Sequence, residues 1–437
     1  MKLKYGLWAV IATTAIVTSC AEDDAPFSEA NTPTENNTTY ARSRANGNQA
    51  LQIANIFSNT RGFAEESTRN KTAKLAELTS TSCYVDHGDT LLYAFNYGDS
   101  EGYIVIGSNL SMFPIVAQSD TGNIDLEQVD KESPFFYFIE KTASIVNESL
   151  NLSPDTSATS FWKDVDNDNF IYTVEVGTDL AESTNKTRSS HSTGWEHIFP
   201  STGYQINGRW SQNGDYSYAA KNGAYIGCPA VAIGMLLYDV RLRDTGSKMD
   251  TWPQFTYSDI RNSKAKTVSS KFRKIADMIP NYRWGSGAGM SSGAKGTDIV
   301  NGLKALGFPN ATIDHFDLST AYKEMCYTET DSKTGMASTR HRGILLCGIS
   351  DYGSGHIWFC DGYQEVKYQV TKRRKLTGRV VSRRTEYESQ LFMNWGQGSG
   401  ENGYFAVNGN TGLSSDCAYH NNVMMITGLK KYNKIHK

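Results

Sequence analysis

A helical repeat of apolar residues begins directly after a cysteine in the middle of the chain. Residues 230–240 carry apolar side chains at the spacing i, i+3, i+4, i+7, which predicts a buried helix that starts at Cys228. Pro229 suits its first turn, where no backbone N–H donor is needed. A thiol at a helix N-terminus meets unpaired N–H groups and the positive end of the helix dipole, which favour the thiolate. Cys228 is therefore a candidate nucleophile, and the alternative is an inert buried thiol.

The pattern before this helix indicates a separate module of helices and strands. Apolar residues at helical spacing predict a short helix over 49–57 and a longer one that starts at Ser133 and Pro134. Apolar runs predict strands at 82–86, 91–96, 103–107 and 115–118. No catalytic cluster stands out in this part. We expect a compact α+β domain over residues 49–185.

The pattern after residue 195 changes from helical to extended. A glycine-rich stretch at 285–296 precedes a predicted helix at 297–306. Strand-like runs then follow at 343–348, 356–363, 366–370, 391–394 and 403–407. A helical first part followed by antiparallel strands predicts a two-lobed α+β domain over residues 195–437.

The amino-terminal end carries the features of an export signal. Two lysines precede an apolar run over 7–17, which is too short to span a bilayer comfortably, although an uncleaved membrane helix is the alternative. The run leads into Val-Thr-Ser-Cys, which resembles a bacterial lipobox and implies that Cys20 is acylated. We therefore expect a lipoprotein signal peptide at 1–20, a flexible tether at 21–48, and the lipid as the only membrane contact. The protein would face the periplasm or the cell surface at the outer membrane, or be released after processing.

Composition narrows the choice of partners. The net charge of -3 gives no argument for nucleic-acid binding. The seven cysteines show no CxxC or Cys/His spacing, so no metal or cofactor site is predicted. Cys347 and Cys360 flank an expected turn, so they are either disulfide-bonded across two strands or two buried thiols. The polar stretch at 186–194 predicts an exposed processing linker, where Lys186 and Arg188 suit a trypsin-like activating protease.

A thiolate nucleophile needs a base, and the chain contains eight histidines. His356 stands out because glycines precede it and an apolar run follows, so that it opens a strand beneath a turn. It lies 128 residues after Cys228, close to the spacing of papain-type chains. Asn394 can accept the ring N–H and fix the tautomer, and Trp395 can cover that hydrogen bond. Gln212, together with the N–H of Cys228, can hold a developing oxyanion.

Four motifs in this order resemble those of the streptopain family of bacterial cysteine peptidases. They are WSQNGDY at 210–216, GCPAVA at 227–232, GHIWFCDG at 355–362 and MNWGQGSGENGYF at 393–405. The block at 91–122 and the helix after it are similar to the inhibitory prodomain of that family. The resemblance implies a papain-like catalytic domain with Cys228 as nucleophile, His356 as general base and acid, Gln212 as oxyanion donor, Asn394 as orienting residue and Trp395 as its cover.

The chain departs from the family pattern at three places. Pro229 stands where Val is common, Gln397 replaces a second Trp, and an insert carries basic runs at 372–375 and 383–384. The change at Gln397 puts any subsite role of that position in doubt. The insert is either a solvated hairpin or a docking patch for acidic partners.

We expect a secreted cysteine endopeptidase, made as a zymogen and acting as a monomer on proteins or peptides. The thiolate would form a thioester acyl-enzyme, which water activated by His356 hydrolyses. The prodomain at 49–185 would inhibit the cleft until the linker at 186–194 is cut, by the enzyme itself or by another protease. Two alternatives stay open: an amidase or transglutaminase on the same fold, and a surface binding lipoprotein with a vestigial peptidase domain.

Overall fold

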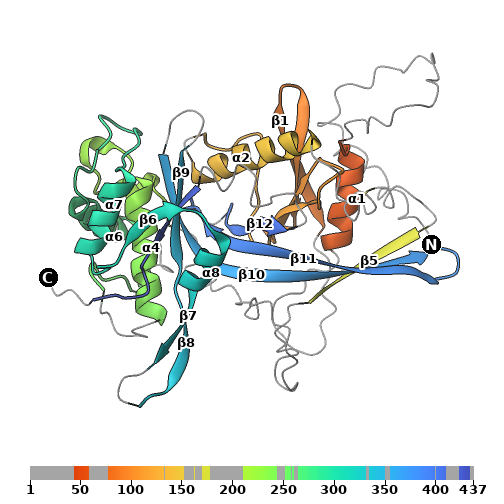
Figure 1. The fold of residues 1–437 in the computed structure, drawn as a ribbon. Helices are drawn as coiled ribbons and strands as arrows, with labels where there is room; N and C mark the ends of the chain where they lie inside the picture. Colours follow the sequence, from red (N-terminus) through yellow and green to blue (C-terminus); the bar gives the residue numbers. More distant parts are fainter. Residues whose placement is uncertain are drawn as a thin grey trace, which may run out of the picture.

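The computed structural model (Figure 1) describes residues 44–58, 77–131, 133–151, 162, 170–177, 210–243, 251–256, 258–259, 264–330, 334–349, 355–398, 400–409 and 423–433. The expected signal peptide with Cys20, most of the tether and the linker at 186–194 lie outside these ranges and stay predictions. Among the described residues, no helix is long and apolar enough to cross a membrane.

Within these ranges, an antiparallel sheet of eleven strands runs through the molecule. Its order is β1-β2-β3-β4-β12-β11-β10-β9-β13-β6, and β5 pairs with the far part of β10. The strands are β1 (Leu78–Asp86), β2 (Asp89–Tyr97), β3 (Tyr103–Gly107), β4 (Ile115–Ser119), β5 (Phe170–Gly177), β6 (Thr312–His315), β9 (Ile344–Ile349), β10 (Gly355–Arg374), β11 (Val380–Asn394), β12 (Gly403–Gly409) and β13 (Val423–Thr427). A separate hairpin contains β7 (Cys326–Thr330) and β8 (Ala337–His341).

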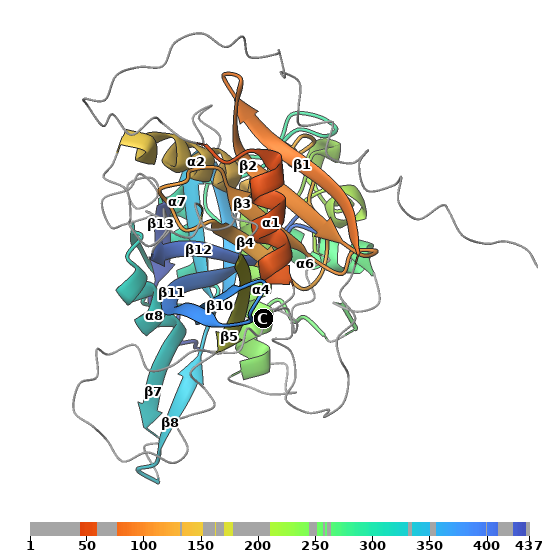
Figure 2. The ribbon, with the colours of Figure 1, turned by 90° about the vertical axis from the view of Figure 1, so that its right-hand side faces the viewer.

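Helices cover both faces of the sheet and form a lobe at one end of it (Figures 1 and 2). They are α1 (Gly47–Ser58), α2 (Pro134–Glu148), α4 (Cys228–Arg243), α6 (Ala265–Met278), α7 (Gly296–Ala305) and α8 (Leu318–Met325). Strand β2 shows why its sequence is apolar at almost every position. Leu92 and Ala94 pack in the core under α2, whereas Tyr93 and Phe95 pack in the core under α1.

Several predicted elements are confirmed, and the fold class is α+β as expected. Helix α2 begins where the sequence places it, because the Ser133 hydroxyl accepts a 2.9 Å hydrogen bond from the N–H of Phe136 and Pro134 occupies the first turn. The strands predicted at 356–363 and 366–370 are one continuous strand, β10, and the basic insert forms the tip of the long β10–β11 hairpin.

The N-terminal half (residues 44–177) and the C-terminal half (residues 210–433) share both the sheet and a hydrophobic core. Strand β4 pairs with β12 through the residue pairs Gln118↔Tyr404 and Ala117↔Phe405. The shared core contains aromatic side chains from α2 and from the C-terminal strands, namely Phe135, Tyr137, Phe138, Trp358, Trp395 and Phe405. The expected domain boundary between 185 and 195 lies outside the described residues and stays a prediction.

The two cysteines that flank the β9–β10 connection are not joined. Cys347 pairs with Ile357, and Cys360 pairs with Ile344, so the two thiols belong to different positions of the ladder. Cys360 lies in the core under α2, whereas Cys347 packs against the core under α4. Both remain thiols, which excludes the disulfide alternative in this form of the chain.

Candidate active site

Cys228 is the first residue of α4, where the sequence predicts a helix start. The backbone turns sharply before it, because Gly227 has a φ of 89°. A Cβ on Gly227 would lie 2.4 Å from the carbonyl oxygen of Ser292 and 2.5 Å from the hydroxyl oxygen of Tyr282. Tyr282 in turn donates a hydrogen bond of 2.6 Å to the carbonyl oxygen of Ile226. Only glycine fits this turn, and the turn fixes the position of the thiol.

Cys228 is partly buried and packs against the core under α4. Burial raises its pKa to about 11, although hydrogen bonds from the N–H groups of Ile357 and of Cys228 itself act in the opposite direction. The sequence suggested that the helix N-terminus would favour the thiolate. In this form of the chain that expectation is wrong, because the loss of solvation outweighs the helix dipole. At neutral pH the intact chain therefore holds Cys228 as a thiol.

His356 lies on β10, directly across from Gly348 of β9. The residue is 6% exposed, and its Nε2 atom has no hydrogen-bond partner among the described residues. Burial lowers the pKa of the imidazole to about 4, and the carboxyl group of Asp130, from the N-terminal half, acts against this shift. The imidazole is therefore neutral at physiological pH.

The thiol and the imidazole belong to opposite faces of the sheet. Side chains alternate along a strand, and Ile357 packs in the core under α4 whereas Trp358 packs in the core under α2. By this alternation His356 shares the face of Trp358. A Cβ on Gly348 would lie 2.3 Å from the ring of Tyr137, so α2 passes directly over the neighbouring strand position. Helix α2 therefore covers the predicted base on the face that points away from the thiol.

Asn394 ends β11 opposite Phe359, and not opposite His356. The residue is fully buried, and its Oδ1 atom accepts a long hydrogen bond of 3.4 Å from the N–H of Gly396. Its Nδ2 atom has no partner among the described residues. The expected hydrogen bond from the ring of His356 is not formed here, because cross-strand partners share a face and Asn394 therefore lies on the face of Phe359.

Trp395 packs among rings of the N-terminal half instead of covering a histidine–asparagine pair. Its ring centroid lies 5.6 Å from that of Phe138 and 5.8 Å from that of Phe135, both on α2, and 5.4 Å from that of Trp358. Its indole N–H donates a 2.9 Å hydrogen bond to the carbonyl oxygen of Glu401. The contact with α2 is one that single-sequence reasoning could not have placed.

Gln212 is held next to the start of α4 by backbone hydrogen bonds. Its carbonyl oxygen accepts from the N–H of Ile226 at 3.1 Å and from the hydroxyl of Ser217 at 2.5 Å. Its own N–H donates to the carbonyl oxygen of Gly396 at 3.1 Å. The structure thus brings Gln212, the turn before Cys228 and the turn after Asn394 together, although these segments are far apart in the sequence.

Two carboxyl groups that the sequence analysis did not single out meet at the joint between the halves. Burial raises the pKa of Glu401 to about 7, and the nearby Asp130 adds to that shift. The same Asp130 acts on His356. The backbone of Glu401 is also tied to the N-terminal half, since the Tyr103 hydroxyl donates a 2.9 Å hydrogen bond to its carbonyl oxygen. Asp130 of the N-terminal half therefore lies close enough to His356, the predicted base, to affect its pKa.

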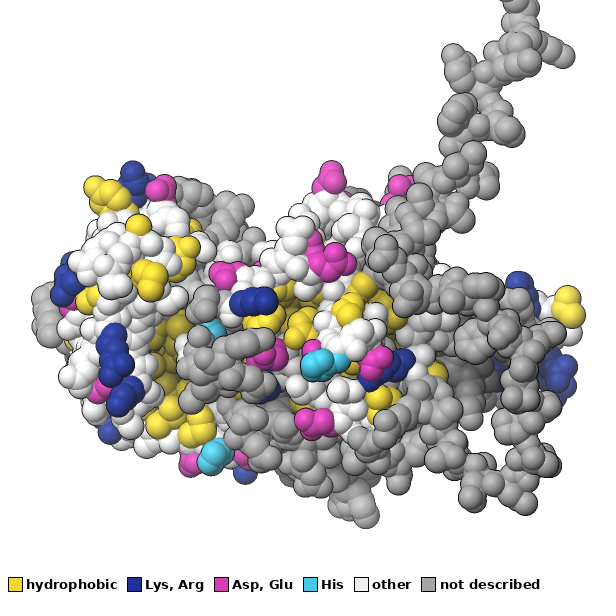
Figure 3. Space-filling view, turned by 90° about the horizontal axis from the view of Figure 1, so that it is seen from above, with side chains coloured by type: hydrophobic (Ala, Val, Ile, Leu, Met, Phe, Trp, Pro, Cys, Tyr) yellow, Lys and Arg dark blue, Asp and Glu magenta, His cyan; other side chains and the backbone are white. Residues whose placement is uncertain are grey.

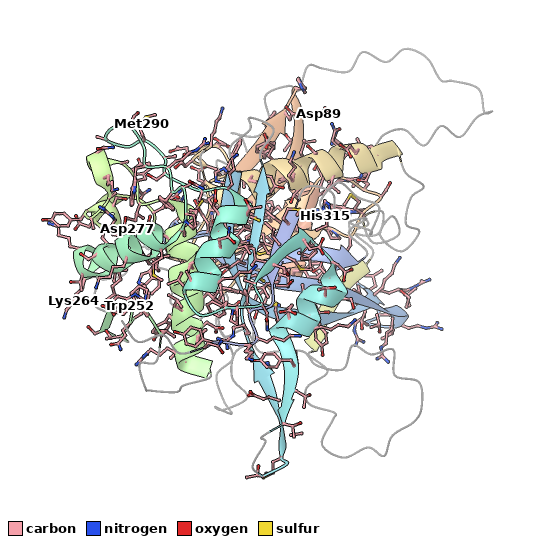
Figure 4. All side chains as sticks on the ribbon, turned by 60° about the vertical axis from the view of Figure 1, so that its left-hand side comes forward. Asp89, Trp252, Lys264, Asp277, Met290 and His315 are labelled. Carbon is pink, nitrogen blue, oxygen red and sulfur yellow. The ribbon has the colours of Figure 1, made fainter. Side chains whose placement is uncertain are left out.

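A glycine-rich loop forms one wall beside the thiol. The N–H of Tyr225 donates to the carbonyl oxygen of Met290 at 3.0 Å, and the hydroxyl of Ser292 accepts a hydrogen bond of 3.0 Å from the N–H of Gly285 within the same loop. The Met290 side chain is 53% exposed and points outward from the lobe that carries Asp277 on α6 (Figure 4). This loop and Tyr282 therefore border the turn that carries Cys228.

Comparisons with known proteins bear on the N-terminal half. Residues 37–143 match the family model described as Spi protease inhibitor, which confirms the expected kind of domain at this end of the chain. A solved structure of a fragment of Prevotella intermedia prointerpain A, with a cysteine replaced by alanine, is similar over 82% of this chain and 99% of its own, at 14% identity and a TM-score of 0.43. That score is too low for this likeness to assign the fold. No curated protein matches the chain at a significant level.

Proposed function

We propose that the chain is the zymogen of a cysteine endopeptidase. The observation that carries the proposal is the position of the inhibitor-like half: its helix α2 and its Asp130 lie at His356, the predicted base of a thiol that begins a helix. A neutral imidazole turned away from a protonated thiol cannot take its proton. The N-terminal half would thus keep the site inactive by covering the base.

Removal of the N-terminal half would free the start of β10 to rearrange, so that the imidazole of His356 reaches the face of Cys228. The imidazole would then take the thiol proton, and the thiolate would attack the carbonyl carbon of a peptide bond. The oxyanion would be held by the amide of Gln212 and the N–H of Cys228. The imidazolium would protonate the leaving amine, and water activated by His356 would hydrolyse the thioester. Asn394 would orient the ring in that state.

The cellular setting is part of the proposal. Export through the signal at 1–20, acylation of Cys20 and cutting within 186–194 would give a processed enzyme whose inhibitor half leaves or is degraded. Support comes from the sequence of these segments alone. Mass spectrometry of the membrane fraction would test acylation, since Cys20→Ala should lose the lipid mass.

The test of the catalytic proposal compares the wild type with Cys228→Ala, both expressed without residues 1–20. Each is incubated with and without trypsin, followed by intact mass, and assayed on casein and with an epoxide probe for thiol peptidases. We expect the wild type to lose the residues that precede the cut within 186–194, to react with the probe and to cleave casein, while Cys228→Ala stays inert. If the wild type, freed of its N-terminal half, neither reacts with the probe nor cleaves casein, the proposal is wrong.

The two alternatives give different results in the same assay. Incorporation of a labelled amine into casein without net proteolysis would indicate acyl transfer to amines by the same thiol. A processed chain with no reactive Cys228 would instead favour a surface binding lipoprotein. The position of the Gln212 backbone beside the start of α4 favours a catalytic role for Cys228 over a vestigial site.

A further inference from the structure

The far half of the β10–β11 hairpin has a sheet edge that one strand of the N-terminal half completes. Strand β11 covers one side of β10 from Phe359 to Arg373. Strand β9 covers the other side only from Gly355 to Cys360. Farther along, that second side pairs with β5, in a continuous register from Lys367↔Gly177 to Arg374↔Phe170. Figure 1 shows β5 lying along this part of the hairpin.

This hairpin also inserts into the core of the N-terminal half. Val370 is buried in the core that contains Phe57 of α1 and Trp162. Thr371 next to it is buried as well. The β10 edge over residues 367–374 is therefore covered by groups that precede the proposed cut at 186–194. Loss of the N-terminal half would expose an unpaired strand edge with an apolar contact point at Val370.

The tip of the hairpin is strongly basic. Between 371 and 385 the sequence carries seven Lys and Arg residues and no Asp or Glu, namely Lys372, Arg373, Arg374, Lys375, Arg379, Arg383 and Arg384. Arg374, Lys375 and Arg379 are exposed, and Leu376 beside them is 97% exposed. Figure 3 shows basic side chains gathered at the end of the molecule where the hairpin projects. A single-sign patch of this kind attracts acidic chains, and salt weakens that attraction.

We propose that the β10 edge over residues 367–374 becomes a strand-binding exosite for extended, acidic segments of protein substrates once the N-terminal half has left. Main-chain hydrogen bonds along the edge would hold the segment, and the basic tip would select its charge. Strand β5 shows the kind of occupant that fits: it is rich in aromatic and β-branched residues, and in the sequence Asp164, Asp166 and Asp168 directly precede it. This inference rests on the proposed function, because that function supplies the removal of β5.

The test uses the trypsin-processed chain and a fluorescent peptide of residues 164–177, with a scrambled peptide of equal composition as the control. Binding is followed by fluorescence anisotropy at two salt concentrations. We expect the native-order peptide to bind at least tenfold more tightly than the scrambled one, and to bind more weakly at high salt. Equal binding of the two peptides would overturn the strand register. If the cut N-terminal fragment stays on the hairpin, as seen by gel filtration, the edge is never free and the proposal is wrong.

A charge-reversal variant separates the exosite from the catalytic cleft. Arg374→Glu, Lys375→Glu and Arg379→Glu are combined, because all three side chains are exposed. We expect this variant to bind the peptide at least tenfold more weakly and to cleave casein more slowly, while its cleavage of a short fluorogenic peptide is unchanged. Unchanged peptide binding would overturn the role of the basic tip.

A matched variant controls for net charge. Lys264→Glu, Lys295→Glu and Lys304→Glu make the same change in charge on exposed positions of the helical lobe (Figure 4 labels Lys264). This variant should bind the peptide as the wild type does. If both variants bind the peptide equally weakly, net charge alone explains the weaker binding, and the role of the basic tip is wrong. If no variant cleaves the short peptide, the proposed function fails, whereas the anisotropy still reports on the edge.

Discussion

Glu401 and His356 are expected to give the intact chain two opposing pH dependences. Burial and Asp130 raise the pKa of Glu401 from 4.5 to about 7, and burial lowers the pKa of His356 from 6.5 to about 4. Between pH 4.5 and 6.5 both groups are neutral in the folded chain, whereas both are charged in the unfolded chain. Each pH unit of such a difference is worth about 1.4 kcal/mol.

The signs of the two contributions differ. An acid with a raised folded pKa stabilises the fold below pH 4.5 and loses that contribution as the pH rises through 7. A base with a lowered folded pKa stabilises the fold above pH 6.5 and loses that contribution as the pH falls to 4. Each contribution changes the free energy of unfolding by about 3 kcal/mol over its pH window. Because the two changes have opposite signs, the pH dependence of the parent chain cancels to within about 1 kcal/mol.

Removing one group exposes the contribution of the other. In a Cys228→Ala background, Glu401→Gln should gain stability relative to the parent by about 3 kcal/mol between pH 4.5 and 7.5, because it no longer has to ionise in a buried place. His356→Gln should show the opposite trend, with its relative gain of similar size at low pH. Urea unfolding followed by tryptophan fluorescence gives both differences at each pH.

The reference for the loss of one exposed carboxyl group is Glu148→Gln, at the end of α2. Subtracting the effect of Glu148→Gln on the unfolding free energy at each pH leaves the contribution of the Glu401 carboxyl group at the contact between the halves. If the Glu401→Gln curve then runs parallel to that of the parent from pH 4.5 to 7.5, the carboxyl group ionises as in water. In that case the buried joint between the halves, as argued from Asp130 and α2, is wrong.

Three further outcomes test the surroundings of the thiol. In urea unfolding, Gly227→Ala should destabilise the chain by about 1–3 kcal/mol more than Gly214→Ala. Both glycines have a positive φ, but only at Gly227 does a backbone atom lie 2.4 Å from the new Cβ. Equal effects of the two substitutions would contradict this close contact. Ser217→Ala should lower the free energy of unfolding by about 1–3 kcal/mol, because the Ser217 hydroxyl donates to the carbonyl oxygen of Gln212 and accepts from the N–H of Ile226. Unchanged stability would argue against this pair of hydrogen bonds. In the intact chain, Cys228 should react with iodoacetamide at pH 8 about 100 times more slowly than a cysteine with the ordinary pKa of 9.0, as measured by mass, and a rate near that of a free thiol would refute the raised pKa.

Local signals explain what the sequence could predict. The start of α2 was readable because Ser133 and Pro134 act within one turn of each other, and the start of α4 was readable from the apolar spacing after Cys228. The candidate residues at 212, 228 and 394 do lie in segments that meet. Their meeting depends on backbone hydrogen bonds such as Gln212 to Gly396, which no local pattern encodes.

The extent of β10 could not be predicted for a different reason. Gln364 interrupts the apolar pattern, and the sequence therefore suggested two strands. In the structure its amide donates a 2.8 Å hydrogen bond to Gln390 of β11, which also accepts one from Gln118 of β4 at 3.2 Å. The buried Gln364 is tolerated there because Gln390 of the neighbouring strand accepts its amide hydrogen bond. That partner lies 26 residues away in the sequence.

The state of the predicted catalytic pair was also beyond the sequence. The orientation of His356 follows from strand alternation, and its pKa follows from what covers it. Helix α2 and Asp130 supply that cover from more than 200 residues away. A motif can name the residues of such a site, but the inactive arrangement is a property of the whole chain.

The pairing of β4 with β12 has a consequence for the life of a processed chain. While the two halves are joined, β12 is an interior strand between β4 and β11. Without the N-terminal half it becomes an edge strand, and the rings of Trp358 and Trp395 lose the helix that shields them. A processed chain would therefore gain a tendency to self-associate, and its working lifetime would fall as its concentration rises.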